Sequence, residues 1–147
     1  MSTQPHHVPQ GLPPVIPQLV VKDAHAVIEF ATQVFDAKLA HTMPGPDGKG
    51  VMHGMFQIGG VPIFVSDAGG FASPTQANLF VYVPDVDATV ARASARGGKV
   101  LAPVMDMFWG DRWAMVSDPF GNVWQIATHK EDVAPAEMQA RMQKMAK

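Results

Sequence analysis

The sequence contains no cysteine, and no run of apolar residues is long. The absence of cysteine excludes disulfide bonds, thiolate nucleophiles and every zinc site that needs sulfur, so any metal would have to bind through His, Asp or Glu. No apolar segment approaches the roughly 18 residues that a membrane-spanning helix requires. The first residues, MSTQPHHVPQGLPP, lack the hydrophobic core of a signal peptide. We therefore expect a cytoplasmic protein with no membrane partner.

Positive charge is also scarce. The 11 Lys and Arg residues are outnumbered by 13 Asp and Glu residues, which gives a formal net charge of -2, and no basic cluster is present. Nucleic acid is therefore an unexpected partner. With 47% hydrophobic residues in 147, the chain is long enough for one compact domain.

Helix and strand patterns alternate regularly after a polar, Pro-rich arm at residues 1–12. Asp23 and Asp85 are placed to cap two helices, which the apolar periodicity predicts over residues 24–35 and 86–98. Alternating apolar residues and turn signals predict the strands. These cover residues 13–21, 38–43, 51–58, 61–67, 78–83, 99–107, 113–117 and 123–129.

The order of elements indicates an internal duplication. LVVKDAHA aligns with VYVPDVDA at an offset of 62, which places Asp23 on Asp85 (85 − 23 = 62), and the turn glycines Gly60 and Gly121 align at an offset of 61 (121 − 60 = 61). Each copy is a βαβββ unit. Because two half-size copies cannot each close a core, we expect them to share one sheet.

Several segments together resemble the vicinal oxygen chelate superfamily, which includes glyoxalase I, bleomycin-resistance proteins and extradiol dioxygenases. They are VVKDAHAVIEF, PDGKGVMHGMFQIGG, residues 81–133 and PAEMQARM, and the part from FWGDR to DPFG is similar to the PhnB-like branch. The resemblance implies an α+β fold in which two tandem βαβββ modules form an open, barrel-like mixed sheet around a cleft, within a homodimer. The modules would cover residues 13–69 and 76–131 of a single domain, followed by a C-terminal helix at 132–147.

The resemblance also implies where a metal would bind. Metal-dependent members take ligands from the first and last strand of each module, and the corresponding positions here are Ile16, Phe64, Asn78 and Gln125. Two apolar side chains and two neutral amides offer neither imidazole nor carboxylate to a divalent ion. We therefore predict no metal and no cofactor in this chain.

Strand alternation separates a core face from a second face. The core face is aliphatic with one tryptophan: Leu19, Val21, Ile63, Val65, Leu79, Val81, Val83, Trp124 and Ile126. The second face mixes aromatic and neutral polar groups: Ile16, Gln18, His53, Met55, Gln57, Phe64, Ser66, Asn78, Phe80, Tyr82 and Gln125. Such a face suits a small organic ligand. Alternatively, the same residues fill a closed sheet face or a dimer interface.

Two further features are candidates for the site. His53 faces the second side and is a candidate general acid or base, although a strand histidine bonded to a neighbour is the leading interpretation. Trp109 and Arg112 are candidates for a lid that stacks on a ligand ring and pairs with an anion. The alternative is that Arg112 pairs internally with Asp111 or Asp118. The remaining histidines after the arm, among them His129, are expected on the surface.

The C-terminal run APAEMQARMQKMAK predicts a helix that starts after Ala134. Met138, Met142 and Met145 form one stripe, for which packing on the chain's own core is the leading interpretation. A dimer partner and the pocket mouth are the alternatives.

Together these observations favour a protein that binds an aromatic or amphiphilic small molecule without a metal, in the manner of drug sequestration in antibiotic resistance. The alternatives are a metal-dependent lyase, isomerase or dioxygenase of the superfamily, and a metal-free enzyme that uses His53.

Overall fold

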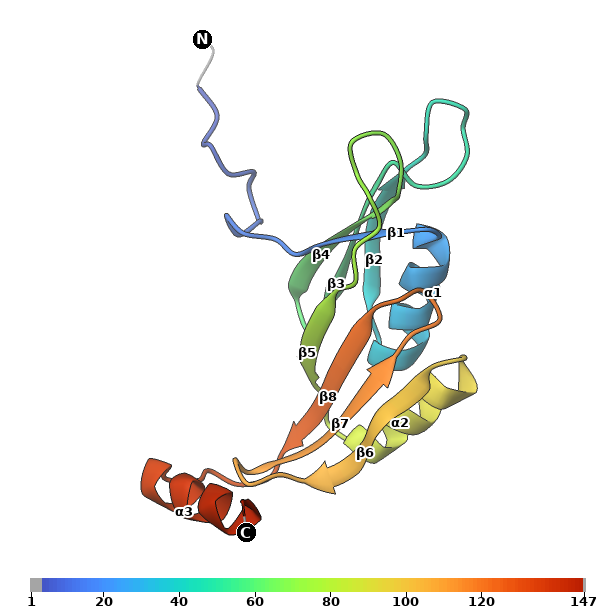
Figure 1. Ribbon diagram of the computed structural model, residues 1–147. Coiled ribbons are helices and arrows are strands. Elements are labelled where there is room, and N and C mark those ends of the chain that lie inside the picture. Colours follow the sequence, from blue (N-terminus) through green and yellow to red (C-terminus); the bar gives the residue numbers. More distant parts are fainter. Residues whose placement is uncertain (1–3, 147) are drawn as a thin grey trace. The chain divides into compact units, whose positions relative to one another are not determined.

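A computed structural model describes residues 4–146 of the chain (Figure 1). Residues 1–3 of the predicted arm lie outside this range. The elements are β1 (Gln18–Val21), α1 (Ala24–Phe35), β2 (Lys38–Met43), β3 (His53–Ile58), β4 (Val61–Asp67), β5 (Asn78–Tyr82), α2 (Val86–Ala95), β6 (Lys99–Asp106), β7 (Asp111–Ser117), β8 (Val123–His129) and α3 (Pro135–Met145). They divide between two compact units, which contain residues 4–32 with 36–75, and residues 33–35 with 76–146.

Both units have the same sheet topology. The first sheet has the strand order β1-β4-β3-β2 and the second has the order β5-β8-β7-β6. In each sheet the outer first strand pairs parallel with the last strand of its module, and the other pairs are antiparallel. The α+β class and the tandem βαβββ modules are therefore confirmed.

The prediction that both modules share one sheet is wrong for the described residues. Each module hydrogen-bonds its strands within its own four-stranded sheet, and the sheets do not close into a barrel. Each unit instead buries apolar surface between its sheet and helical residues. A core therefore forms although no hydrogen-bonded strand pair joins the two sheets.

The duplication extends to the helix caps. Asp23 accepts a hydrogen bond from the Ala26 N–H at 3.1 Å, and Asp85 accepts one from the Ala88 N–H at 3.1 Å. Both caps satisfy a backbone donor that has no partner in the first turn of the helix. Gly60 and Gly121, the aligned turn glycines, both have positive φ angles, of 81° and 94°. These turns require glycine because side chains with a Cβ rarely adopt this conformation.

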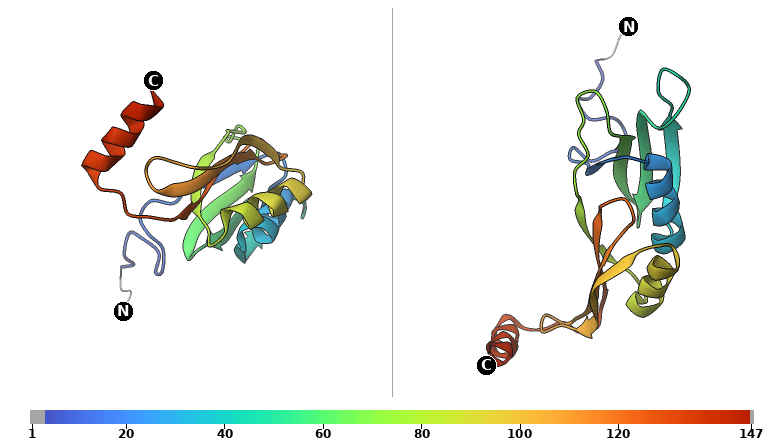
Figure 2. Two further views of the ribbon diagram at one scale, coloured as in Figure 1. Left: turned by 90° about the horizontal axis from the view of Figure 1, so that it is seen from below. Right: turned by 45° about the vertical axis from the view of Figure 1, so that its right-hand side comes forward.

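The core lies on the face that strand alternation predicts. Leu19, Val21, Val65 and Ile63 are buried in the first unit, and in the second unit Trp124 and Ile126 are fully buried with Ala114 and Val116. Helix α2 contacts β6, β7 and β8 on this side of the second sheet (Figure 2). On the opposite face of each sheet most side chains are exposed or half-buried, and the buried residues there include Ser66, Asp111 and Ala127.

Two predictions about the ends of the chain are wrong. The first strand begins at Gln18 rather than at residue 13, because Pro13, Pro14 and Pro17 cannot donate to a ladder. Helix α3 does start after Ala134, but it contains no buried residue, so the methionine stripe does not pack in the core. No helix among residues 4–146 has the length and apolarity needed to cross a membrane.

Candidate functional site

The open face of the second sheet carries most of the predicted ligand-binding residues. The register pairs Phe80 with Gln125 and Tyr82 with Ala127 across β5 and β8. On the other side of β8, Gln125 pairs with Met115 and Ala127 pairs with Trp113. Phe80 is 44% exposed and Tyr82 is 61% exposed, and their ring centres are 5.1 Å apart. Trp113 and Trp109 extend this aromatic surface, with ring centres 6.1 Å apart. We refer to Phe80, Tyr82, Trp109, Trp113 and Gln125 as the aromatic face.

A short hydrogen-bond chain orders the polar groups of this face. Gln125 donates from Nε2 to Asn78 Oδ1 at 3.1 Å, and its own Oε1 accepts from Trp113 Nε1 at 3.2 Å. The oxygen atoms of both amides are thus already engaged as acceptors. The remaining N–H donors of Asn78 and Gln125 give this face neutral polar groups and no charge.

Asp111 binds two rings of the aromatic face through hydrogen bonds. Its side chain is 1% exposed, and its carboxylate accepts hydrogen bonds from Tyr82 Oη at 2.9 Å, Trp109 Nε1 at 2.7 Å and His129 Nδ1 at 2.8 Å. These donors come from β5, from the loop before β7 and from the end of β8. One buried carboxylate therefore holds two rings of the aromatic face in a fixed orientation.

The hydrogen bonds at Asp111 also set its ionisation. Burial tends to raise the pKa of the Asp111 carboxyl, but the hydrogen bonds from His129, Trp109 and Tyr82 outweigh burial and leave the pKa below its usual value. The hydrogen bonds to Asp132 and then to Asp111 raise the pKa of His129. The accepting carboxylate raises the pKa of Tyr82 as well, because it favours the protonated phenol.

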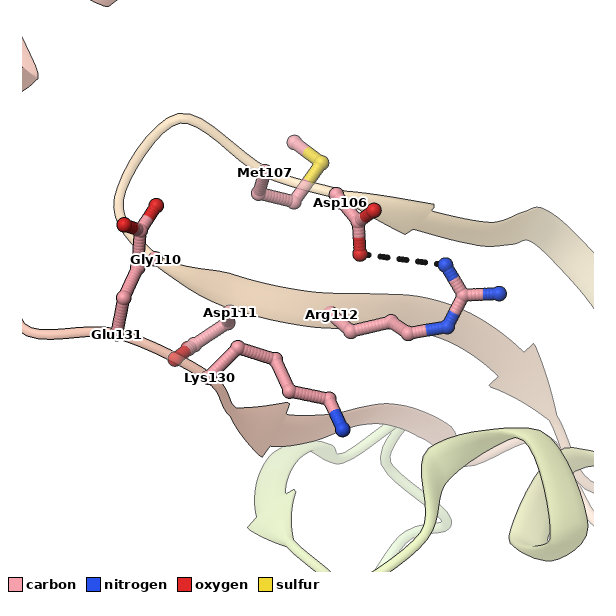
Figure 3. Close-up of a pocket in the computed structure, with 7 residues that line it drawn as sticks. All are labelled: Asp106, Met107, Gly110, Asp111, Arg112, Lys130 and Glu131. Carbon is pink, nitrogen blue, oxygen red and sulfur yellow. Dashed lines mark hydrogen bonds and ion pairs between the residues drawn. The ribbon is translucent and has the colours of Figure 1, made fainter.

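Arg112 lies in an adjoining pocket of about 510 Å³ that Figure 3 shows at the start of β7. Its guanidinium binds Asp87 through Nε at 2.8 Å and Nη2 at 3.0 Å, and Asp106 through Nη1 at 3.2 Å. The predicted internal partners, Asp111 and Asp118, are therefore wrong, because Asp87 and Asp106 pair with Arg112 instead. An anionic ligand would have to compete with two carboxylates for Arg112. Lys130 extends in the same direction and, within residues 4–146, makes no ion pair.

The remaining predicted residues lie in the first unit. Gln18 donates to Ser66 Oγ at 3.3 Å, and Phe64 is half-buried with its ring edge-on to His53 at a centre separation of 4.7 Å. His53 is half-buried and makes no hydrogen bond within the described part of the chain. Within residues 4–146, His53 therefore has no carboxylate partner that would orient it as a general base.

The side chains at the four positions where the superfamily resemblance implies metal ligands are poorly suited to a divalent ion. In the first unit, Ile16 and Phe64 have no donor atoms. In the second unit, the oxygens of Asn78 and Gln125 already accept hydrogen bonds. Residues 4–146 also contain no group of three or more His, Cys, Asp or Glu side chains arranged to hold a metal.

Comparison with known sequences shows the family of the chain. A sequence model of the Glyoxalase/Bleomycin resistance protein/Dioxygenase superfamily matches residues 6–126. The chain belongs to this superfamily. An uncharacterized protein of Mycobacterium bovis is 36% identical over 141 residues, which cover 88% of this chain and 92% of the relative.

Solved structures of other proteins share the fold. TioX from Micromonospora sp. ML1 matches with a TM-score of 0.65 and 24% identity, over 78% of this chain and 96% of TioX. A PhnB protein from Bacillus cereus matches with a TM-score of 0.63 and 16% identity, over 79% of this chain and 98% of that protein. At these identities the likeness concerns the fold, and it places PhnB-like proteins among the structural relatives.

The sequence interpretation missed Asp111 and His129 as parts of one network. Their contact depends on the pairing of β7 with β8, in which Asp111 lies opposite His129. The sequence contains no local signal for this pairing beyond the predicted strands themselves.

Proposed function

We propose that this chain binds a small aromatic or amphiphilic molecule on the aromatic face and that binding requires no metal. The observation that carries the proposal is the exposure of Phe80 and Tyr82 on a sheet whose other face holds the core. Exposed, adjacent rings next to neutral amides are suited to stack on a flat apolar ligand and to orient its polar groups.

The rigidity of the face supports binding rather than mere exposure. Tyr82 and Trp109 share the buried carboxylate of Asp111, so neither ring has to be ordered when a ligand arrives. Pre-ordered side chains lower the entropic cost of association. The amide and apolar groups at positions 16, 64, 78 and 125, which are weak ligands for divalent ions, support the proposal that binding needs no metal. Among the activities in the name of the superfamily, drug binding in bleomycin resistance best fits such a face.

Tag-free protein titrated with bleomycin and with a panel of aromatic amphiphiles, in the presence of a chelator, provides the test. We expect saturable quenching of tryptophan fluorescence and a rise in melting temperature for at least one compound, with no turnover of it. Binding that disappears with chelator and returns with a divalent ion would overturn the metal-independent proposal.

Substitutions locate the site. Phe80→Ala removes an exposed ring that contacts the ring of Tyr82. Stacking and the area buried on one ring are together worth about 1–3 kcal/mol. We therefore expect at least ~10-fold weaker binding. Val61→Ala, which shortens another exposed apolar side chain at the start of β4, is the matched control. Equal affinity in both variants would exclude the aromatic face.

Phe64→Asp tests whether the first unit also contributes. The change places a carboxylate on the open face of the first sheet beside His53, and we expect weaker ligand binding because the ligand is apolar. Unchanged affinity in the folded variant would remove Phe64 from the site.

Homodimer formation is part of the proposal, on the basis of the superfamily resemblance. A dimer would give twice the chain mass of 15.8 kDa by light scattering. A monomeric mass at micromolar concentration would contradict it.

A further inference from the structure

Two short sequence motifs meet on the open face of the first sheet. His41 and Met43 alternate along β2, and His53 and Met55 alternate along β3. The antiparallel register sets His41 opposite Met55, and Met43 opposite His53. Since alternate residues of a strand point to the same side, all four side chains share one face. We call these four residues the His-Met cluster.

The side-chain nitrogen and sulfur atoms of the His-Met cluster have no hydrogen-bond partners among residues 4–146. His41 and Met43 are exposed, and His53 and Met55 are half-buried. Within residues 4–146 neither imidazole makes a hydrogen bond or ion pair, and neither thioether has a polar partner. The intervening residue of β3, Gly54, lies on the core side, where an added Cβ would meet Val65 and Thr42 side chains at 3.3 and 3.4 Å. This close packing fixes β3 between its neighbours and keeps the cluster on the outer face.

The spacing of the two histidines fits a shared ion. Their ring centres are 5.5 Å apart with an interplanar angle of 42°. With a metal–nitrogen bond of about 2.0 Å and roughly 1.1 Å from a ring nitrogen to the ring centre, two imidazoles on one ion have centres about 5 to 6 Å apart. The methionines lie directly across the ladder from these histidines, and their unbranched thioethers are flexible enough to reach an ion between the rings.

We propose that the His-Met cluster binds a soft monovalent metal ion, Cu(I), through two imidazoles and two thioethers. Thioether sulfur selects Cu(I) over hard divalent ions, and imidazole is a good ligand for copper. Four neutral ligands suit a single positive charge, whereas the cluster lacks the carboxylates that a hard divalent ion prefers. The site uses none of positions 16, 64, 78 and 125, and it does not depend on the proposed binding of an organic molecule.

The test is an anaerobic titration of the tag-free full chain with Cu(I) in competition with bicinchoninate. We expect one Cu(I) per chain. The double variant Met43→Leu/Met55→Leu preserves side-chain size and removes both sulfurs, and we expect at least ~10-fold weaker binding, because even outer-shell groups around a metal are worth 10–100-fold in affinity. His41→Gln/His53→Gln should weaken binding by a similar factor.

Two matched controls carry the same residue types elsewhere. Met142→Leu/Met145→Leu removes two exposed methionines from α3, and His6→Gln/His7→Gln removes the stacked histidines of the arm. Both should bind Cu(I) like the unmodified chain. Thermal unfolding of each variant verifies that it is folded, and X-ray absorption should show both nitrogen and sulfur around copper, with the sulfur lost in Met43→Leu/Met55→Leu.

Three results would overturn the proposal. The first is full affinity in the folded Met43→Leu/Met55→Leu variant, even if the histidine variant loses binding, because the site would then be a histidine pair. The second is loss of binding in the His6→Gln/His7→Gln control. The third is a titration in which bicinchoninate retains all the copper.

Discussion

Replacing Asp118 tests how the turn before β8 is held. The Asp118 carboxylate is buried and accepts four hydrogen bonds, from the Phe120 and Asn122 N–H groups, from Asn122 Nδ2 and from Trp124 Nε1, each at 2.9 Å. The turn leads into β8, which carries Gln125 of the aromatic face. Asp118→Ala would remove the acceptor for all four donors at once.

The magnitude follows from the donors that cannot reach water. Asn122 and Trp124 are both 0% exposed, so their side-chain N–H groups would be left buried without an acceptor. Each such group costs about 1–3 kcal/mol, which gives a loss of about 4 kcal/mol from these two alone. A domain of this size has a total stability of about 5–15 kcal/mol, so the variant should lose a quarter or more of its stability.

Urea unfolding, followed by circular dichroism and tryptophan fluorescence, measures this loss. Asp118→Asn should be intermediate, because its Oδ1 can still accept the two backbone N–H bonds while its amide nitrogen faces two donors. Asp106→Ala is the matched control, since its side chain is 78% exposed and we expect little change. A loss below about 1 kcal/mol for Asp118→Ala, with an unchanged denaturant slope, would refute the reasoning about buried donors.

Two further predictions concern the helix caps and His129. Asp23→Ala and Asp85→Ala should each lower the free energy of unfolding by about 1 kcal/mol, measured by urea unfolding, and equal stability would show that the caps do not matter. Because its carboxylate partners, Asp132 first, raise the pKa of His129, their stabilising contribution should be complete below about pH 6.5 and lost as the pH rises through the folded pKa. The melting-temperature difference between the unmodified chain and Asp132→Asn should therefore shrink from pH 6 to pH 9, and a constant difference would contradict this assignment.

Much of the fold could be predicted because its signals are local. The capping aspartates, the turn glycines and the alternation of apolar residues predict α1 and β4 with the bounds that the structure has, and they predict the duplication as well. The predicted start of β1 is wrong because apolar residues between prolines resemble a strand, although Pro17 and the prolines before it cannot donate to a ladder.

The candidate site was predictable only in part. Alternation correctly separates Phe80 and Tyr82 from the core face, because side-chain direction along a strand depends on sequence position alone. The partners of Arg112 were not predictable, since Asp87 lies on α2 and reaches Arg112 only through tertiary packing. The prediction that the methionine stripe of α3 packs in the core is wrong because helical periodicity shows that side chains share a face and does not show what that face contacts.

The sequence by itself therefore determined the superfamily, the two βαβββ modules and the capped ends of the first two helices, all of which rest on residues close to one another in the chain. Tertiary structure decided that the modules keep separate sheets, that Asp111 collects donors from distant segments and that His41 faces Met55. The physical reason is that each of these features joins residues far apart in the chain. The pairing of His41 with Met55, for example, depends on a strand register across the loop at residues 44–52 that is fixed only when the sheet forms.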